Sequence, residues 1–169
     1  CQPLLDSANL ADQVLRSRTP SAEDALVTTL VDRVVGVIRA GVPIDPQFAN
    51  WYWFDDDLWQ LDLSSPYMVE DGDLIYDTSG FRREFPWAIR RLVYRELMKM
   101  AVRYTDAEYV LTDVMTQLHR MGLPEWCPAV AEAARDRHQV TIDPDEAKRR
   151  CEADAKFYPF LLRAKRFER

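Results

Sequence analysis

The stretch of the chain that decides the fold reads DPQFANWYWFDDDLWQLDL, over residues 45–63. Two short runs rich in aromatic and apolar residues, 51–54 and 58–63, flank three consecutive aspartates. Aromatic residues favour strands, and aspartates favour turns because their short side chains bond to nearby backbone groups. The pattern predicts a polar loop followed by a small β-hairpin with a solvated turn at Asp55–Asp57. We expect the aromatic residues of the hairpin to belong to the core, namely Trp51, Trp53, Phe54 and Trp59.

Helical spacing dominates the sequence on both sides of this stretch. Apolar residues recur at intervals of three and four between Leu26 and Ile38, after Thr19-Pro20 and before Gly41, which predicts an amphipathic helix over 20–40. Residues 1–19 are expected to be a hinge-like lead-in, and residues 64–85, which show no clear period, an irregular segment with a turn. Further helices are predicted over 86–104, 106–121 with a capping box from Thr105 and Glu108, 124–138, and 144 to about 167. The chain is therefore expected to be one mainly α domain over 1–169, with the small hairpin embedded in it.

The composition narrows the classes of partner. The 169 residues include 28 acidic and 22 basic side chains, a formal net charge of −6, which opposes binding to phosphate backbones and anionic lipid. Three cysteines without a CxxC pair indicate neither a disulfide framework nor a zinc site. No apolar run reaches the 18 residues of a transmembrane helix. We expect a cytoplasmic protein that binds neither nucleic acid nor membrane.

Three polar residues in and around the hairpin could together carry phosphoryl-transfer chemistry. That chemistry needs an acceptor hydroxyl held in line and oxygen ligands for magnesium, because positioning and charge neutralisation supply most of the catalysis. Asp45 and Asn50 are five positions apart in the loop, and Asp62 lies at the end of the second expected strand. Each also has a purely structural interpretation, because Asp and Asn in loops commonly bond to the neighbouring backbone.

This order and spacing resembles the C-terminal lobe of the protein-kinase-like and aminoglycoside-phosphotransferase-like folds. In those folds the catalytic-loop Asp and a metal-binding Asn are five positions apart, and a second metal-binding Asp follows one hairpin later, as Asp62 does here. The stretches Asn50-Trp51 and Leu61-Asp62-Leu63-Ser64-Ser65-Pro66 are also similar to an uncharacterised bacterial kinase-like family with an Asn-Trp and an Asp-Val-(Ser/Thr)-Thr-Pro signature. With the helix over 20–40 in the place of the helix before the catalytic loop, the resemblance covers nearly the whole chain.

The resemblance implies roles for these residues. Asp45 would orient the acceptor hydroxyl or accept its proton, while Asn50 and Asp62 would coordinate Mg²⁺ that bridges the phosphates of ATP. Gln2-Pro3-Leu4-Leu5-Asp6 would be the hinge to an N-terminal lobe, with its backbone against the adenine. No glycine-rich loop and no paired lysine of such a lobe can be assigned in the chain. We therefore expect that the chain alone does not transfer phosphate, and that the acceptor of the whole protein is a small-molecule hydroxyl.

Two departures from the pattern favour other hypotheses. Pro43 stands where a histidine usually precedes the catalytic Asp, and Leu63-Ser64 stands where Phe-Gly usually follows the metal-binding Asp. A pseudokinase-type regulatory or binding module would keep the fold without catalysis, and a helical interaction domain would have no nucleotide site at all. Because the chain opens at Cys1 without a methionine, we also expect a fragment, with an exposed apolar face near Leu4, Leu5 and the hairpin, where the missing lobe would sit.

Overall fold

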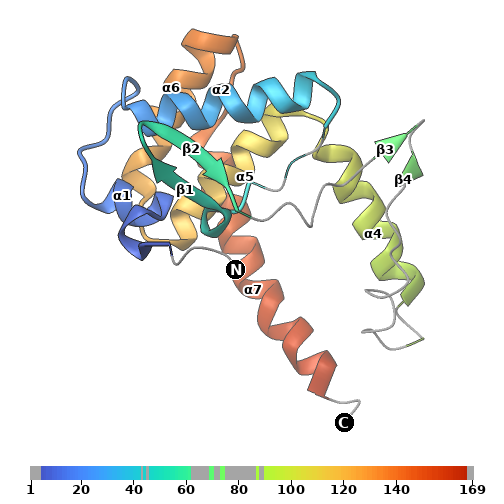
Figure 1. The fold of residues 1–169 in the computed structure, drawn as a ribbon. Helices are drawn as coiled ribbons and strands as arrows, with labels where there is room; N and C mark the ends of the chain where they lie inside the picture. Colours follow the sequence, from blue (N-terminus) through green and yellow to red (C-terminus); the bar gives the residue numbers. More distant parts are fainter. Residues whose placement is uncertain are drawn as a thin grey trace.

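The computed structural model describes residues 5–42, 44, 46–61, 69–70, 73–74, 87 and 90–166. These residues form mostly helices, with the predicted hairpin and one further short ladder, so the mainly α class is confirmed (Figure 1). In chain order the elements with helical backbone are η1 (Ser7–Asn9), α1 (Ala11–Arg16), α2 (Ala25–Arg39), η2 (Phe48–Asn50), α4 (Arg90–Arg103), α5 (Ala107–Arg120), η3 (Pro124–Trp126), α6 (Cys127–His138) and α7 (Pro144–Arg166), where η marks a short 3-10 helix.

Helix α2 begins later than predicted, after a different cap. The expected start was Thr19-Pro20, but the N-cap is Asp24, whose carboxylate accepts hydrogen bonds from the backbone N–H groups of Leu26 at 2.8 Å and Val27 at 3.3 Å. The guanidinium of Arg18 binds the same carboxylate at 3.1 Å and holds it in place. A carboxylate that satisfies two free N–H groups at the positive end of the helix dipole is a strong cap, which explains why the helix starts there.

The lead-in over residues 1–19 contains a helix that the sequence did not predict. Helix α1 buries Ala11 and Leu15 in the core. The residue before it, Leu10, forms an isolated β-bridge with Tyr52 of the hairpin, so this segment is attached to the rest of the fold. A helix of six residues is too short for an apolar period to be recognised, which is why the pattern indicated only a hinge-like segment.

The predicted hairpin is confirmed. Strand β1 (Trp51–Phe54) pairs antiparallel with β2 (Asp57–Gln60). The two connecting residues, Asp55 and Asp56, have positive φ angles of 53° and 55°, as in the two-residue type I′ turn that matches the twist of paired strands. Aspartate is one of the few residues other than glycine that adopt this backbone at small cost. The acidic turn is exposed, as expected.

A second, smaller ladder lies in the segment predicted to be irregular. Strand β3 (Val69–Glu70) pairs antiparallel with β4 (Asp73–Leu74). The residues that connect these two strands, where the turn was expected, lie outside the described residues. Strands of two residues give no alternating pattern in the sequence, so the ladder itself could not be predicted.

The four predicted C-terminal helices are confirmed, with small shifts at their ends. The start of the first, expected at Pro86, lies outside the described residues. Helix α5 begins after Asp106, whose carboxylate accepts a hydrogen bond from the N–H of Glu108 at 3.0 Å, so the cap is Asp106 rather than Thr105. The helix stops before Gly122, whose φ of 71° is the left-handed conformation that commonly ends helices.

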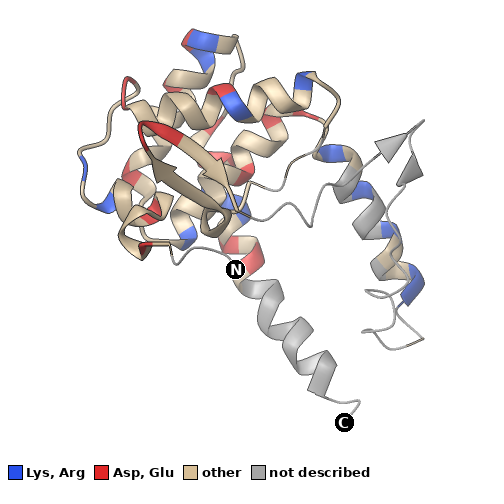
Figure 2. Ribbon diagram, in the orientation of Figure 1, with Lys and Arg blue, Asp and Glu red and all other residues tan. Residues whose placement is uncertain are grey.

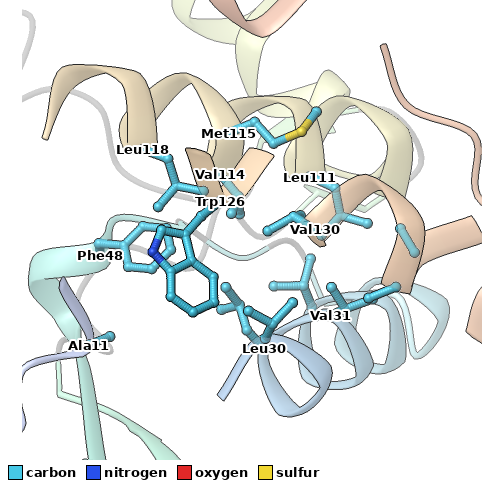
Figure 3. Close-up of a cluster of buried hydrophobic side chains, with 14 of the residues drawn as sticks. Ala11, Leu30, Val31, Phe48, Leu111, Val114, Met115, Leu118, Trp126 and Val130 are labelled. Atoms are coloured by element: carbon cyan, nitrogen blue, oxygen red, sulfur yellow. The ribbon is translucent and has the colours of Figure 1, made fainter. Parts of the chain in front are cut away.

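Helix α5 is the centre of the core, because it contacts α2, α6 and α7. The apolar stripe predicted for α2 and the apolar stripe of α5 are both buried and face one cluster (Figure 3). Removal of this apolar surface from water, at about 25 cal/mol per Å², is the main stabilising contribution to the fold. The buried members of the two stripes are Leu26, Leu30, Val31, Val34, Val35, Ile38, Val110, Leu111, Val114, Met115 and Leu118.

A cluster of charged side chains joins α2 to α6 at the surface. Arg137 binds both carboxylate oxygens of Asp32, with its Nε at 2.8 Å, and Nε2 of His138 lies 2.7 Å from the same carboxylate. The hydrogen bond from Arg137 is the main reason that the pKa of Asp32 lies below its usual value, although partial burial opposes the shift. His138 is half-buried against the neighbouring helix.

Charges of both signs are spread over the described surface. Figure 2 shows acidic and basic residues mixed over α2, α5 and α6, whereas Lys and Arg recur along α4. Among the described helices, none combines the length and the apolar character that crossing a membrane requires.

Candidate functional site

Of the three predicted site residues, the structure describes Asn50. It is the last residue of η2, directly before β1, and it is half-buried. Asp45, the predicted catalytic residue, and Asp62, the second predicted magnesium ligand, lie outside the described residues. What the structure describes is the frame that carries them, with Ile44 and residues 46–50 on one side and Leu61 on the other.

The loop before the hairpin is anchored in the core by alternate side chains. Ile44 is 5 % exposed, Pro46 is buried and Phe48 is 1 % exposed, whereas Gln47 and Ala49 are exposed. Figure 3 shows the ring of Phe48 in the same cluster as side chains of α5 and of the η3 turn. Interiors are packed to crystal-like density, so a loop held in this way cannot shift without opening the core.

The backbone of this loop is also held by a buried hydrogen bond. The N–H of Phe48 donates to Oε1 of Gln117 on α5 at 3.1 Å. The other end of the same amide, Nε2, donates to Oδ2 of Asp113 at 3.3 Å, and the hydroxyl of Tyr104 donates to that oxygen at 3.2 Å. Gln117 therefore holds the backbone amide of Phe48, and Asp113 and Tyr104 support Gln117 from behind.

Asp113 is the half-buried acid of this network. Desolvation raises the pKa of its carboxyl above the usual value. The hydrogen bonds from Gln117 and Tyr104 and the positive charges of Arg120 and Arg150 oppose that shift. A carboxyl in this environment has the character of an internal hydrogen-bond acceptor rather than of a surface charge.

The hairpin brings the two ends of the predicted site together. Beyond the last ladder pair, Leu61 donates its backbone N–H to the carbonyl oxygen of Asn50 at 2.7 Å. Residues opposite one another in antiparallel strands have Cα atoms about 5 Å apart. Asn50 therefore lies beside the residue that directly precedes Asp62 in the chain.

An arginine on α2 binds strand β2 of the hairpin. The guanidinium of Arg33 binds the carboxylate of Asp57 at 2.8 Å and also donates to the backbone oxygen of Leu58. Bidentate contacts of arginine fix orientation as well as distance. The third aspartate of the turn thus has a structural role, while Asp55 and Asp56 remain in solvent.

The two faces of the hairpin differ in exposure. Trp51 and Trp53 point into the core, as predicted, but Phe54 and Trp59 are 54 % and 57 % exposed, so the prediction that they are core residues is wrong. Neighbours along a strand point to opposite faces and opposed residues share a face. Trp59 is opposite Tyr52, which places both on the outer face together with Phe54. The number of aromatic residues in the two strands did not indicate that only one face of the hairpin would be covered.

This outer face matches the apolar surface expected near the hairpin. Leu5 and Leu61 are each 44 % exposed, in addition to the two aromatic rings, and Leu4 lies outside the described residues. Tyr52 is the exception, because it is 7 % exposed and its hydroxyl accepts a hydrogen bond from Asn9 at 3.2 Å. We call Phe54, Trp59 and Leu61 the outer apolar face.

A magnesium site at this place depends on residues at both ends of the hairpin. Within the described part of the chain, no group of three or more His, Cys, Asp or Glu side chains lies together as a metal site would require. The amide oxygen of Asn50 and the carboxylates of Asp45 and Asp62 are the hard oxygen ligands that Mg²⁺ prefers, so the chemistry of the donor set fits the ion.

Sequence reasoning missed the network behind the loop. The signal that could have indicated it is the pair Asp113 and Gln117, two polar residues four apart that border the apolar stripe of α5. Polar side chains in such a place are buried only if they find hydrogen-bond partners. The partner could not be predicted, because Phe48 is 69 residues away from Gln117 in the chain.

In comparisons with known proteins, the chain matches no protein-family model, no curated protein and no solved structure.

Proposed function

We propose that the chain is the magnesium-binding and substrate-binding lobe of an ATP-dependent phosphotransferase-like protein that acts on a small-molecule hydroxyl. In this proposal Asn50 and Asp62 hold Mg²⁺, and Asp45 orients the acceptor hydroxyl or accepts its proton. The ion, when bound, neutralises charge on the phosphates of ATP. Transfer would also need an N-terminal lobe that grips the nucleotide.

The observation that carries the proposal is the hydrogen bond between the N–H of Leu61 and the carbonyl of Asn50. It joins one proposed magnesium ligand to the covalent neighbour of the other. The pairing of β1 with β2 brings these two positions together, and shared coordination of one ion needs that proximity.

The anchoring of the loop is a second support. Phosphoryl transfer depends on positioning, and groups that position a reactant must be held to within about 0.5 Å by their surroundings. The described part of the loop, residues 46–50, is fixed by the buried ring of Phe48 and by the bond from its N–H to Gln117. A loop that merely connected α2 to the hairpin would not need both anchors.

The outer apolar face supports the presence of a second lobe. Its members, Phe54, Trp59 and Leu61, lie on the hairpin next to the proposed site. Contiguous exposed aromatic and aliphatic side chains commonly mark a surface that another protein part covers. We propose that the N-terminal lobe of the same protein packs there.

The outer apolar face gives a testable expectation for the chain as it is. Exposed apolar surface favours self-association, so the double substitution Phe54→Ser with Trp59→Ser should weaken association about tenfold or more, as when aromatic anchors are removed from an interface. Sedimentation velocity over a range of protein concentrations measures this. Trp87→Ser is the matched control, because Trp87 is 83 % exposed but lies outside the hairpin. Equal association of the wild-type chain and the double variant would contradict the role of this face.

The magnesium site is tested by metal titration. Mn²⁺ is a paramagnetic substitute for Mg²⁺, and in the presence of ATP we expect it to broaden the NMR signals of Asn50 and Leu61 first. Asn50→Ala and Asp62→Asn should each lower the metal affinity about tenfold or more, because each removes one oxygen ligand or its charge. Asp45→Ala, which removes the proposed orienting residue, should reduce phosphate transfer by the full-length protein.

Asp55→Asn is the matched control for this titration. It removes an exposed carboxylate from the same hairpin, and asparagine tolerates the left-handed backbone of the turn. An equal affinity loss in the control would mean that the metal is attracted by general acidity. Metal and ATP binding without transfer by the full-length protein would favour the pseudokinase-type binding module instead. Absence of any localised metal effect would leave the helical interaction domain.

A further inference from the structure

The amide of Gln117 has a hydrogen-bond partner at each of its two ends. Its oxygen accepts from the N–H of Phe48 at 3.1 Å, and its nitrogen donates to Asp113 at 3.3 Å. Gln117 itself is 8 % exposed. If the amide were turned round, its NH₂ group would face the N–H of Phe48 and its oxygen would face a carboxyl, so two contacts would be lost together. One orientation is therefore imposed on the side chain.

Asp113 and Tyr104 hold the Gln117 amide in this orientation. Asp113 Oδ2 receives hydrogen bonds from both Gln117 and the hydroxyl of Tyr104, which is 8 % exposed and follows directly after α4. The ring of Tyr104 is in turn packed edge-on against Tyr109 of α5, with the centroids 5.6 Å apart. Asp113 and Tyr104 therefore hold the side chain of Gln117, whose oxygen is the acceptor for the N–H of Phe48. A site is commonly held in this way by the residues around it.

We infer that Gln117 is a positioning residue for the proposed site: with Asp113 and Tyr104 behind it, its carbonyl oxygen fixes the backbone of residues 46–50 and so sets where Asn50 stands. The role of the loop in this inference rests on the proposed function. The way in which Gln117 holds the loop does not depend on that function. Gln117 reaches the loop at its midpoint, between the two proposed functional residues. No contact of Gln117 with a substrate or an ion is involved.

The first experiment measures amide exchange at Phe48. Gln117→Leu keeps the side-chain volume and removes the acceptor, so the protection factor of the Phe48 amide in NMR-detected hydrogen exchange should fall about tenfold or more. The amide of Val34, in the buried centre of α2, should keep its protection because the fold remains.

Thr112→Val is the matched control for that experiment. Thr112 lies on the same helix and is 3 % exposed, but its hydroxyl donates to the carbonyl of Glu108 within its own helix, at 2.7 Å. This control should leave the exchange of Phe48 unchanged. Unchanged protection of Phe48 in Gln117→Leu, or an equal loss in Thr112→Val, would overturn the inference.

A second variant keeps the inference testable if Gln117→Leu does not fold. In Gln117→Glu a carboxyl faces Asp113, whose pKa is already raised by burial. At low pH the two carboxyls are expected to share a proton, so the introduced carboxyl can still accept from Phe48. As the pH rises both carboxyls ionise and repel each other, with Arg120 and Arg150 as the nearby cations that oppose this. Protection of Phe48 in this variant should be near the wild-type value at low pH and fall at high pH, whereas a pH-independent protection factor would contradict the role of Gln117.

A metal titration separates this inference from the proposed function. Gln117→Leu should weaken Mn²⁺ binding at Asn50 about tenfold, and Thr112→Val should not. If neither the wild type nor any variant binds the metal there, the proposed function fails, while the exchange experiment still decides whether Gln117 positions the loop. If the metal binds equally in the wild type and in Gln117→Leu, positioning by Gln117 is refuted and the proposed function stands.

Discussion

Replacement of Phe48 by alanine should lower the free energy of unfolding by about 3–5 kcal/mol, the usual cost of removing a buried aromatic ring. The ring is 1 % exposed and belongs to the main core cluster, although it is carried by a loop and not by a long helix or a strand (Figure 3). Chemical denaturation followed by tryptophan fluorescence measures the loss, provided that the slope of the transition stays the same. The loop of the proposed site should loosen in the same variant.

Phe54→Ala is the internal comparison for this result. The two phenylalanines are close in sequence, but Phe54 is 54 % exposed on the outer face of the hairpin. Its replacement should change the free energy of unfolding by no more than about 0.5 kcal/mol. Equal losses in the two variants would show that Phe48 does not anchor the loop in the core, and would remove one of the supports for a rigid site.

The helices and the main hairpin could be predicted because their signals are local. The apolar period between Leu26 and Ile38 and the three aspartates at 55–57 each determine a structure within a short window. The start of α2 was wrong because two candidate caps competed, and the choice fell to Asp24, which also binds Arg18. The six residues of α1 were missed because their burial depends on contacts with the hairpin and the core.

The sequence predicted the candidate site residues but not the contacts that hold the loop of the site in place. The spacing of Asp45, Asn50 and Asp62 indicated which residues to consider, and the hairpin between them was correct. That Phe48 and Gln117 hold the loop could not be predicted, because the contact joins positions far apart in the chain. The exposure of Phe54 and Trp59 was missed for a related reason, since the composition of a strand does not tell which of its faces is covered.

Trp126→Ala should have an effect as large as that of Phe48→Ala, for a different reason. Trp126 closes the η3 turn, which contacts both α5 and α6, and its side chain is 1 % exposed in the same cluster as Phe48. The cavity left by the indole would cost about 3–5 kcal/mol, because the rigid helices on either side cannot collapse into it. For a chain of this size that corresponds to a fall in the melting temperature on the order of 10 °C.

Trp59→Ala separates the cost of this cavity from the general loss of a tryptophan. Trp59 has the same side chain but is 57 % exposed on β2, so its removal should leave the melting temperature within about 2 °C of the wild type. Circular dichroism at a fixed protein concentration makes the comparison, because association through the outer apolar face would otherwise shift the melting temperature. If Trp59→Ala destabilises the chain as much as Trp126→Ala does, the outer face is covered in solution, and the lobe or second copy that covers it becomes part of the folded unit.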